Sequence, residues 1–363
     1  MNVLHLSSEQ SWRGGEQQLA YLVEGLNKKG VEQWVFCREE SAMHAYCKRN
    51  EINKYTFIKK SFYSFSAARK CKEICAKHNI DLVHVHDSQS HTVAILSAVL
   101  FGNRTAIILS RKVDFPVSSN PFSKYKYNHP QIRKIICVSD AVKKIMTADI
   151  SNSHLLTVIH DGVNLQRFSK PSTGFLRKKY NLSSDTLIIG NIAAIAPHKD
   201  YFTFVDTVEL LVNAQLKAKY FIVGDGPERK AIENYIENKK LAQHIILTGF
   251  INNIEEVLPE FDIFLFTSKT EGLGSSLLDA ALAKVPVVST NAGGIPEIIK
   301  DGETGLLVPV QNPKVLSEKV MLLANNKKLR KELAMNASEN VKNFSTDQLT
   351  EKTLAVYTEV LSS

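Results

Sequence analysis

A glycine-rich turn between two acidic side chains is the stretch of this sequence best suited to chemistry. The turn Glu271-Gly272-Leu273-Gly274 leads directly into Ser275 and Ser276. Both serines are good N-cap residues, so we expect the free amide groups of a new helix to open beside two glycines that let a ligand approach closely. Amide groups at the start of a helix bind phosphate. The turn therefore predicts a phosphate site.

Glu271 and Asp279 flank this predicted phosphate site. A separation of eight residues keeps both on one side of a helix, about 12 Å apart along its axis if the whole segment is helical. Carboxylates accept hydrogen bonds from hydroxyl groups, so the pattern suits a molecule with hydroxyl groups on both sides of a diphosphate. A nucleotide sugar is such a molecule. The ordinary alternative is that the two acids only complement the dipole of the helix.

The whole string FTSKTEGLGSSLLDAALAKVPVVSTNAGGIP, residues 266–296, closely resembles the acidic signature of the retaining glycosyltransferases of the GT-B fold, in particular glycosyltransferase family 4. The resemblance implies that Glu271 contacts the transferred sugar, that Asp279 serves the ribose, and that Lys199 meets the donor phosphates. The family needs no cofactor, and we expect no metal, since the sequence has neither an Asp-x-Asp motif nor a metal-ligand cluster. The donor-binding residues implied are Gly14, Gly15, Gly249, Phe250, Gly272, Leu273, Gly274, Ser275 and Asp279.

Three positions depart from the family pattern. Ala194 replaces the usual arginine five residues before Lys199, so one phosphate-binding cation is missing. Asp279 stands where the family has a glutamate and is one methylene shorter. Lys284 takes the place of a C-cap glycine, and we expect it to strain or reshape the end of the helix. These departures bear on donor binding and leave the rest of the signature intact.

The first half of the chain carries its candidate residues where predicted strands end. The strand MNVLHL is followed by Gly14 and Gly15 before a helical pattern, and this places both glycines at the carboxyl edge of a sheet, where ligands bind. The buried strand that begins at Asp81 ends near His84, His86 and Asp87. In the family, a histidine at this strand end approaches the transferred sugar, and His86 matches it best. The alternative is a structural histidine.

Length and composition indicate a two-domain globular protein. The chain has 363 residues, with 44% hydrophobic and 23% charged residues, which is ordinary for a soluble protein. The five cysteines include no CxxC pair and read as reduced, mostly buried thiols of a cytosolic protein. The first residues lack the pattern of a signal peptide, and no apolar run is long enough to span a bilayer. We therefore predict a cytoplasmic location.

The positive charge lies in the first half. Residues 1–160 hold 22 lysines and arginines against 13 acids, a net +9, whereas residues 161–363 hold 23 against 24. Two basic stretches with interleaved aromatic residues, 54–72 and 111–134, fit an interfacial membrane patch or single-stranded nucleic acid. The second is too rich in proline and asparagine to be one helix and predicts a long loop. We favour peripheral contact with anionic lipid on the inner face of the membrane over nucleic acid; the ordinary alternative is a basic, partly buried helix.

The alternation of strands and helices in both halves predicts an α/β fold with two Rossmann-like doubly wound domains facing a cleft. We place an acceptor-binding domain at 1–170, a nucleotide-sugar donor domain at 171–344, and a helix at 345–363 that returns to the first domain. The predicted reaction transfers a sugar, with retention, from a nucleoside diphosphate sugar to a glycan or lipid-linked acceptor in cell-surface polysaccharide or lipopolysaccharide synthesis. The alternatives are a nucleotide-sugar epimerase of the same scaffold and a catalytically silent module that binds a glycan or nucleotide sugar.

Overall fold

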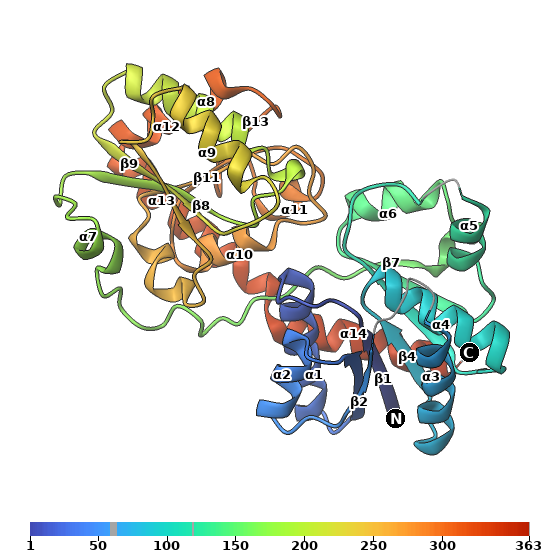
Figure 1. Cartoon of the computed structure of the whole chain (residues 1–363). Coiled ribbons are helices and arrows are strands. Elements are labelled where there is room, and N and C mark those ends of the chain that lie inside the picture. The colour runs from blue at the N-terminus through green and yellow to red at the C-terminus, as the bar shows by residue number, and fades with distance from the viewer. Residues whose placement is uncertain (59–63, 118–119, 363) are drawn as a thin grey trace. The chain divides into compact units, whose positions relative to one another are not determined.

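The protein, seen in a computed structural model that describes residues 1–58, 64–117 and 120–362, divides into two compact units. The first unit comprises Met1–Gly162 and Thr346–Ser363, and the second comprises Val163–Ser345. Each unit is built around its own parallel sheet (Figure 1).

The first unit contains a seven-stranded sheet with the order β3-β2-β1-β4-β5-β6-β7, and its neighbouring strands pair in parallel. The order reverses between β1 and β4, so their carboxyl ends form the place where a doubly wound sheet binds ligands. The strands are β1 (Asn2–Ser7), β2 (Glu32–Arg38), β3 (Lys54–Phe57), β4 (Leu82–Val85), β5 (Ala106–Arg111), β6 (Ile132–Cys137) and β7 (Leu156–Val158). The helices are α1 (Gly14–Lys28), α2 (Ala42–Arg49), α3 (Phe65–Lys77), α4 (Ser88–Phe101), α5 (Pro121–Tyr127), α6 (Asp140–Thr147) and α14 (Thr346–Ser362), with a 3-10 turn η1 (Ser153–Leu155).

The second unit contains a six-stranded sheet with the order β10-β9-β8-β11-β12-β13, again parallel between neighbours. Its order reverses between β8 and β11. The strands are β8 (Leu187–Ile192), β9 (Ala218–Val223), β10 (Ile245–Gly249), β11 (Ile263–Phe266), β12 (Val287–Thr290) and β13 (Leu306–Val308). The helices are α7 (Phe175–Lys179), α8 (Tyr201–Asn213), α9 (Arg229–Asn238), α10 (Ser275–Leu282), α11 (Ile295–Ile298), α12 (Pro313–Asn325) and α13 (Lys327–Asn340), with 3-10 turns η2 (Pro197–Lys199), η3 (Ile254–Glu256), η4 (Leu258–Glu260) and η5 (Val341–Phe344).

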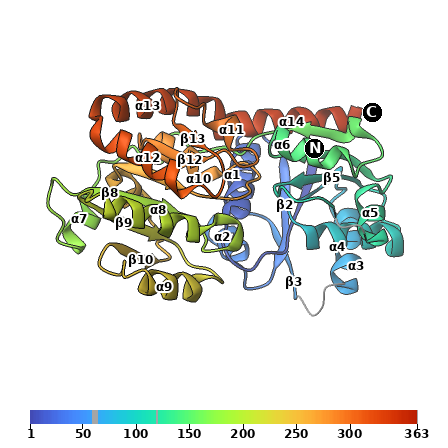
Figure 2. The same cartoon turned by 90° about the horizontal axis from the view of Figure 1, so that it is seen from above.

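Strand β11 shows how the second sheet is held. All four of its residues are fully buried, as expected for a parallel strand covered on both faces. Ile263 and Leu265 join one apolar cluster with residues of α8 and α12, which contact each other (Figure 2). Phe264 and Phe266 alternate with them and contact each other, their ring centroids 6.0 Å apart. Its parallel pairing with β8 on one side and β12 on the other places the turn that follows it at the carboxyl edge of the sheet.

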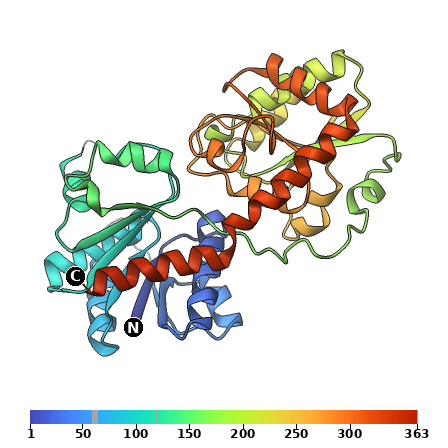
Figure 3. The same cartoon turned by 180° about the vertical axis from the view of Figure 1, so that it is seen from behind.

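The last helix belongs to the first unit, as predicted. Helix α14 packs against α1 (Figure 3). The two helices approach closely at Gly25, where an added Cβ atom would lie 2.0 Å from the Oγ1 atom of Thr350. Tyr357 of α14 is fully buried and reaches the sheet of this unit. The C-terminal segment therefore completes the core of the first unit.

The two basic-aromatic stretches include residues 59–63 and 118–119, which lie outside the described residues. The described part of the first stretch contains strand β3 and the start of helix α3 instead of the single helix considered from the sequence. Helix α3 buries alanine and cysteine side chains, whereas Phe65 is exposed. The second stretch contains the short helix α5 rather than only a loop, and Phe115, before this helix, and Tyr125, within it, are exposed. All five cysteines are buried and free. None of the helices in the described part of the chain combines the length and apolarity needed to cross a bilayer.

Candidate functional site

The carboxyl ends of β8 and β11 bring together the two side chains that the sequence singled out in the second unit. Lys199 ends the 3-10 turn that follows β8, and Glu271 lies in the turn between β11 and α10. These two strands are neighbours at the position where the strand order reverses. Because parallel strands end at one edge of the sheet, the pair lies where a doubly wound sheet binds ligands.

Lys199 and Glu271 form a buried ion pair. Only 14% of the lysine side chain and 8% of the glutamate side chain are exposed. The lysine Nζ atom and the hydroxyl group of Ser268 both donate hydrogen bonds to Oε1 of Glu271, the latter at 2.7 Å. Nζ also lies 5.0 Å from the ring centroid of Phe266. Lys199, predicted to bind phosphate, and Glu271, predicted to bind the sugar, are therefore paired with each other and hold one another in a fixed position.

Helix α10 begins at Ser275, and Gly274 is its N-cap residue. The expectation that Ser275 and Ser276 cap this helix is wrong, because both serines lie inside its first turn. Gly274 has φ of +89°, a left-handed conformation that suits glycine, and as an N-cap it makes no side-chain hydrogen bond to the helix. The turn 271–274, which includes Gly272 and Leu273, thus leads directly into the first turn of α10.

The loop after β12 packs against the backbone of this turn. The amide of Gly294 donates a hydrogen bond of 3.0 Å to the carbonyl oxygen of Glu271. An added Cβ atom at Gly293, which has φ of +51°, would lie 2.0 Å from the same oxygen. Two loops of the signature string therefore pack backbone against backbone, which requires glycine at 293. This contact fixes Glu271 from the main chain.

Asp279 has a partner within the protein that the sequence did not indicate. Both of its carboxylate oxygens accept hydrogen bonds from Nη1 of Arg167, at 2.9 and 3.1 Å, and Arg167 also pairs with Glu255. Burial raises the pKa of Asp279 to about 6, while the charge and hydrogen bonds of Arg167 act in the opposite direction. The carboxylate predicted to bind ribose therefore has its oxygens engaged by a guanidinium group.

The remaining residues of the second unit that were predicted to bind the donor lie at the same edge of the sheet. Gly249 ends β10 with φ of +74°, and Phe250, the predicted contact for the base, is 64% exposed. The GDGPER turn after β9 lies against the loop after β8: an added Cβ atom at Gly226 would be 2.3 Å from the carbonyl oxygen of Ile195. The glycines of this turn allow close packing between two loops.

At the C-terminal end of helix α10, Lys284 has φ of +57°, the left-handed conformation that suits a glycine at this place.

The glycine pair of the first unit opens helix α1. Gly14 is its first residue, and Glu16 accepts a hydrogen bond of 3.2 Å from the amide of Arg13 in a capping box. Burial raises the pKa of Glu16 to about 7. An added Cβ atom at Gly15 would meet no other atom within 4 Å among the described residues. The space over Gly15 is open, as expected if a ligand approaches the backbone here.

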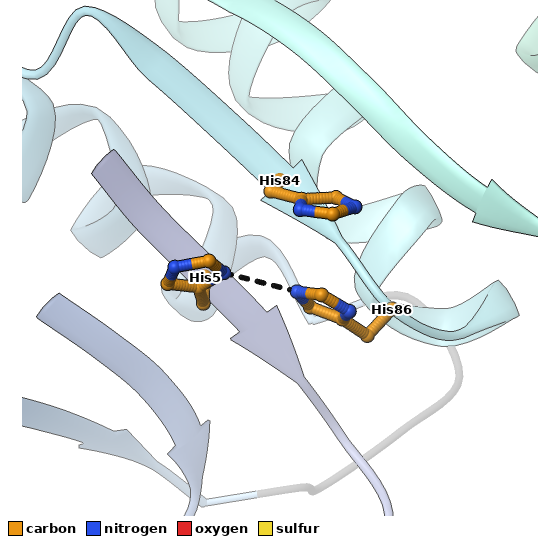
Figure 4. A group of neighbouring side chains, drawn as sticks. All are labelled: His5, His84 and His86. Atoms are coloured by element: carbon orange, nitrogen blue, oxygen red, sulfur yellow. Dashed lines mark hydrogen bonds between the residues drawn. The ribbon is translucent and has the colours of Figure 1, made fainter. Parts of the chain in front are cut away.

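His86 follows β4 and lies beside two other histidines (Figure 4). His5 of β1 and His84 of β4 are register partners, and a nitrogen from each of the three rings lies within 4.8 Å of the others. Three imidazoles at this spacing could hold a metal ion. The sequence alone does not indicate this group, because only the pairing of β1 with β4 brings position 5 next to positions 84 and 86.

The two alternatives to His86 have structural roles. His84 is buried between the hydroxyl groups of Tyr357, at 2.5 Å, and Ser110, at 2.8 Å. Asp87 caps helix α4 and also accepts hydrogen bonds from Ser8. His86 is only partly buried and, with His84, lines a cavity of about 20 Å³, room for about one water molecule. Of the three candidates at this strand end, His86 is the side chain that remains for a ligand.

Both halves of the chain match families of glycosyltransferases. Residues 172–340 match the family described as Glycosyl transferases group 1, and residues 12–167 match Glycosyltransferase Family 4. N-acetyl-alpha-D-glucosaminyl L-malate synthase of Bacillus anthracis is 26% identical over 85% of this chain and 83% of its own length. The capsular polysaccharide biosynthesis glycosyltransferase CapM of Staphylococcus aureus is 25% identical over 62% of each chain.

The structure resembles that of Anabaena HepE in complex with UDP-glucose, with a TM-score of 0.86, 17% identity, and coverage of 99% of this chain and 100% of the other. Two Rossmann-like units with parallel sheets give the chain the GT-B fold, as predicted, and the family models identify it as a glycosyltransferase. Within that class, the chain belongs to glycosyltransferase family 4.

Proposed function

We propose that this protein is a retaining, metal-independent glycosyltransferase that moves a sugar from a nucleoside diphosphate donor to a glycan or lipid-linked acceptor in cell-surface polysaccharide synthesis. The observation that carries the proposal is the buried Lys199–Glu271 pair beside the start of α10. A cation, a carboxylate and helix amide groups at one sheet edge suit the phosphates and the hydroxyl groups of a nucleotide sugar.

In the proposed reaction, the bond between the anomeric carbon and the diphosphate breaks while a bond to the acceptor oxygen forms on the same face. Lys199 and the amide groups at residues 272–275 stabilise the negative charge that develops on the departing diphosphate. Glu271, fixed by Ser268 and by its own backbone, orients the sugar through its hydroxyl groups. The acceptor hydroxyl proton passes to an oxygen of the departing phosphate, so no protein base is required. His86 accepts a hydrogen bond from a sugar hydroxyl group.

Two relatives support the direction of this proposal. The name of the Bacillus anthracis relative specifies an alpha-linked glucosaminyl product, and the Staphylococcus aureus relative is named for capsular polysaccharide synthesis. An alpha product formed from an alpha-linked nucleotide sugar is the outcome that retention requires. Peripheral contact of the basic first unit with anionic lipid would place the protein near a lipid-linked acceptor.

The experiment is a donor and acceptor screen that detects free nucleoside diphosphate and determines the anomeric configuration of the product by NMR. An alpha-linked product from an alpha-linked donor, formed equally with and without a chelator, supports the proposal. An inverted product contradicts retention. Interconversion of two nucleotide sugars without any glycosylated acceptor would identify an epimerase instead.

A further inference from the structure

The side chain of Gln33 determines where the proton of its neighbour His5 lies. The side-chain nitrogen of Gln33 donates a hydrogen bond of 2.8 Å to the carbonyl oxygen of Val23, an atom that can only accept. The amide orientation is thereby fixed, and Oε1 of Gln33 lies 3.2 Å from Nε2 of His5. Because Oε1 is also only an acceptor, Nε2 of His5 must carry a hydrogen atom.

The second nitrogen of His5 is therefore the acceptor in the next contact. His5 is fully buried, and this burial lowers the pKa of its imidazole to about 4, so the ring is neutral near pH 7 and carries a single ring hydrogen. Its Nδ1 atom lies 3.1 Å from Nε2 of His86 (Figure 4). With the hydrogen of His5 on Nε2, the hydrogen of this contact must come from His86.

His86 is thus left with one free lone pair. Burial lowers the pKa of His86 well below its usual value, and His84, His5 and Lys112 act in the same direction; Lys112 itself pairs with Asp161. A neutral ring with its hydrogen on Nε2 has an unprotonated Nδ1 atom, for which no partner is found among the described residues. His84, held by Tyr357 and Ser110, packs against the ring at a centroid distance of 4.1 Å and restricts its rotation.

We propose that Val23, Gln33 and His5 form a hydrogen-bonded chain that fixes the tautomer of His86, so that Nδ1 of His86 accepts a hydrogen bond from a substrate hydroxyl group. Gln33 and His5 are then positioning residues, and the inference about the substrate rests on the proposed glycosyl transfer. Coordination of a metal ion by the three histidines would require Nε2 of His86 to give up its bond to His5 and one nitrogen of His84 to give up Tyr357 or Ser110. The hydrogen-bonded chain keeps the contact of His86 with His5 and both contacts of His84, with no rearrangement of the structure.

NMR determines the tautomer of His86 directly, in the full-length protein without substrate. Histidine labelled with ¹⁵N is introduced, and long-range ¹H–¹⁵N NMR near pH 7 distinguishes protonated from unprotonated ring nitrogens, with assignment by single histidine variants. The expected result is an unprotonated Nδ1 and a protonated Nε2 in His86. The opposite tautomer, or a zinc site of one ion per chain that disappears in His5→Leu, overturns the proposal.

Matched variants connect the tautomer to turnover. His5→Leu removes the acceptor for His86 and should allow the second tautomer, with a loss of about tenfold in kcat/KM that falls mainly on kcat, as expected for one hydrogen bond. His5→Gln can present an amide oxygen to His86 and an amide nitrogen to Gln33, so it should restore the wild-type tautomer and most of the activity. Gln33→Leu, on the neighbouring strand, provides a second break if His5→Leu folds poorly.

The control is His91→Leu, because His91 is equally buried, lies on α4 and is not part of the chain. It should leave the signals of His86 and the kinetic constants unchanged. A shifted His86 tautomer in His5→Leu without any change in kcat/KM would contradict the assigned role of His86 toward substrate, while the hydrogen-bonded chain would stand. A wild-type tautomer in both His5→Leu and Gln33→Leu would show that these residues do not position His86.

Discussion

Replacing Asp279 with asparagine should change how the stability of the second unit depends on pH. Burial raises the pKa of Asp279 from its usual 3.8 to about 6 in the folded protein. The folded state therefore holds the proton more tightly than the unfolded state. Its stabilising effect is complete below pH 3.8 and is lost as the pH rises through about 6. The difference between the two pKa values corresponds to about 3 kcal/mol.

Asparagine keeps the shape of the side chain and an oxygen that can accept from Arg167, but it does not titrate. We expect the free energy of unfolding of the wild type, relative to Asp279→Asn, to fall by up to about 3 kcal/mol between about pH 4 and about pH 7.5. Removing the guanidinium group in Arg167→Met should move the transition to higher pH, because its charge and hydrogen bonds lower the pKa of Asp279.

The assay is urea unfolding followed by circular dichroism at a series of pH values. Fluorescence is less suitable, since both tryptophans, Trp12 and Trp34, lie in the first unit. Asp185→Asn serves as the control: Asp185 is exposed and its pKa is lowered to about 2 by a hydrogen bond from Lys217, below the range of the titration. Parallel curves for the wild type and Asp279→Asn would refute the inference that burial outweighs the guanidinium charge.

Four further predictions concern the donor site and the surface. Glu271→Gln should keep affinity for the nucleoside diphosphate but lower turnover by two or more powers of ten, which product release assays and calorimetry measure; near-normal turnover would contradict its role in the transition state. Asp279→Ala should weaken binding of the ribonucleotide more than that of its 2′,3′-dideoxy analogue in calorimetric titrations, whereas equal losses would mean that the carboxylate serves only Arg167. Lys284→Gly should raise the free energy of unfolding by about 0.5–1 kcal/mol, because it relieves a left-handed side chain at the cost of a more flexible unfolded chain, and an unchanged value would show that the backbone carries no strain there. The protein should sediment with anionic liposomes and less with neutral ones, in a salt-sensitive manner, and equal binding to both would remove the electrostatic explanation.

The sequence determined the features that depend on neighbouring residues. The alternation of strands and helices predicted two parallel sheets. Uninterrupted apolar runs such as Ile263–Phe266 predicted strands that are buried on both faces. The turn 271–274 predicted where α10 begins, and Lys284, in the place of a C-cap glycine, predicted where it ends, since backbone conformations at helix ends follow local chemistry. Lys199 was assigned through the resemblance to glycosyltransferase family 4, and Glu271 through the glycine turn beside it and the same resemblance. Both follow strands, and parallel strands end at one edge of the sheet. Only the identity of the N-cap was wrong there, since a glycine replaced the two serines.

The tertiary structure decided the partners of these residues. Arg167 reaches Asp279 across 112 positions of sequence, and His84 meets Tyr357 across 273. No local pattern can indicate such pairs, because the order of the strands and the packing of distant segments determine which side chains meet. The histidine group has the same origin: the register of β1 with β4 places position 5 opposite position 84. The sequence thus showed which groups could act, whereas packing decided which of them are neutralised, which are held by a neighbour, and which remain to meet a ligand.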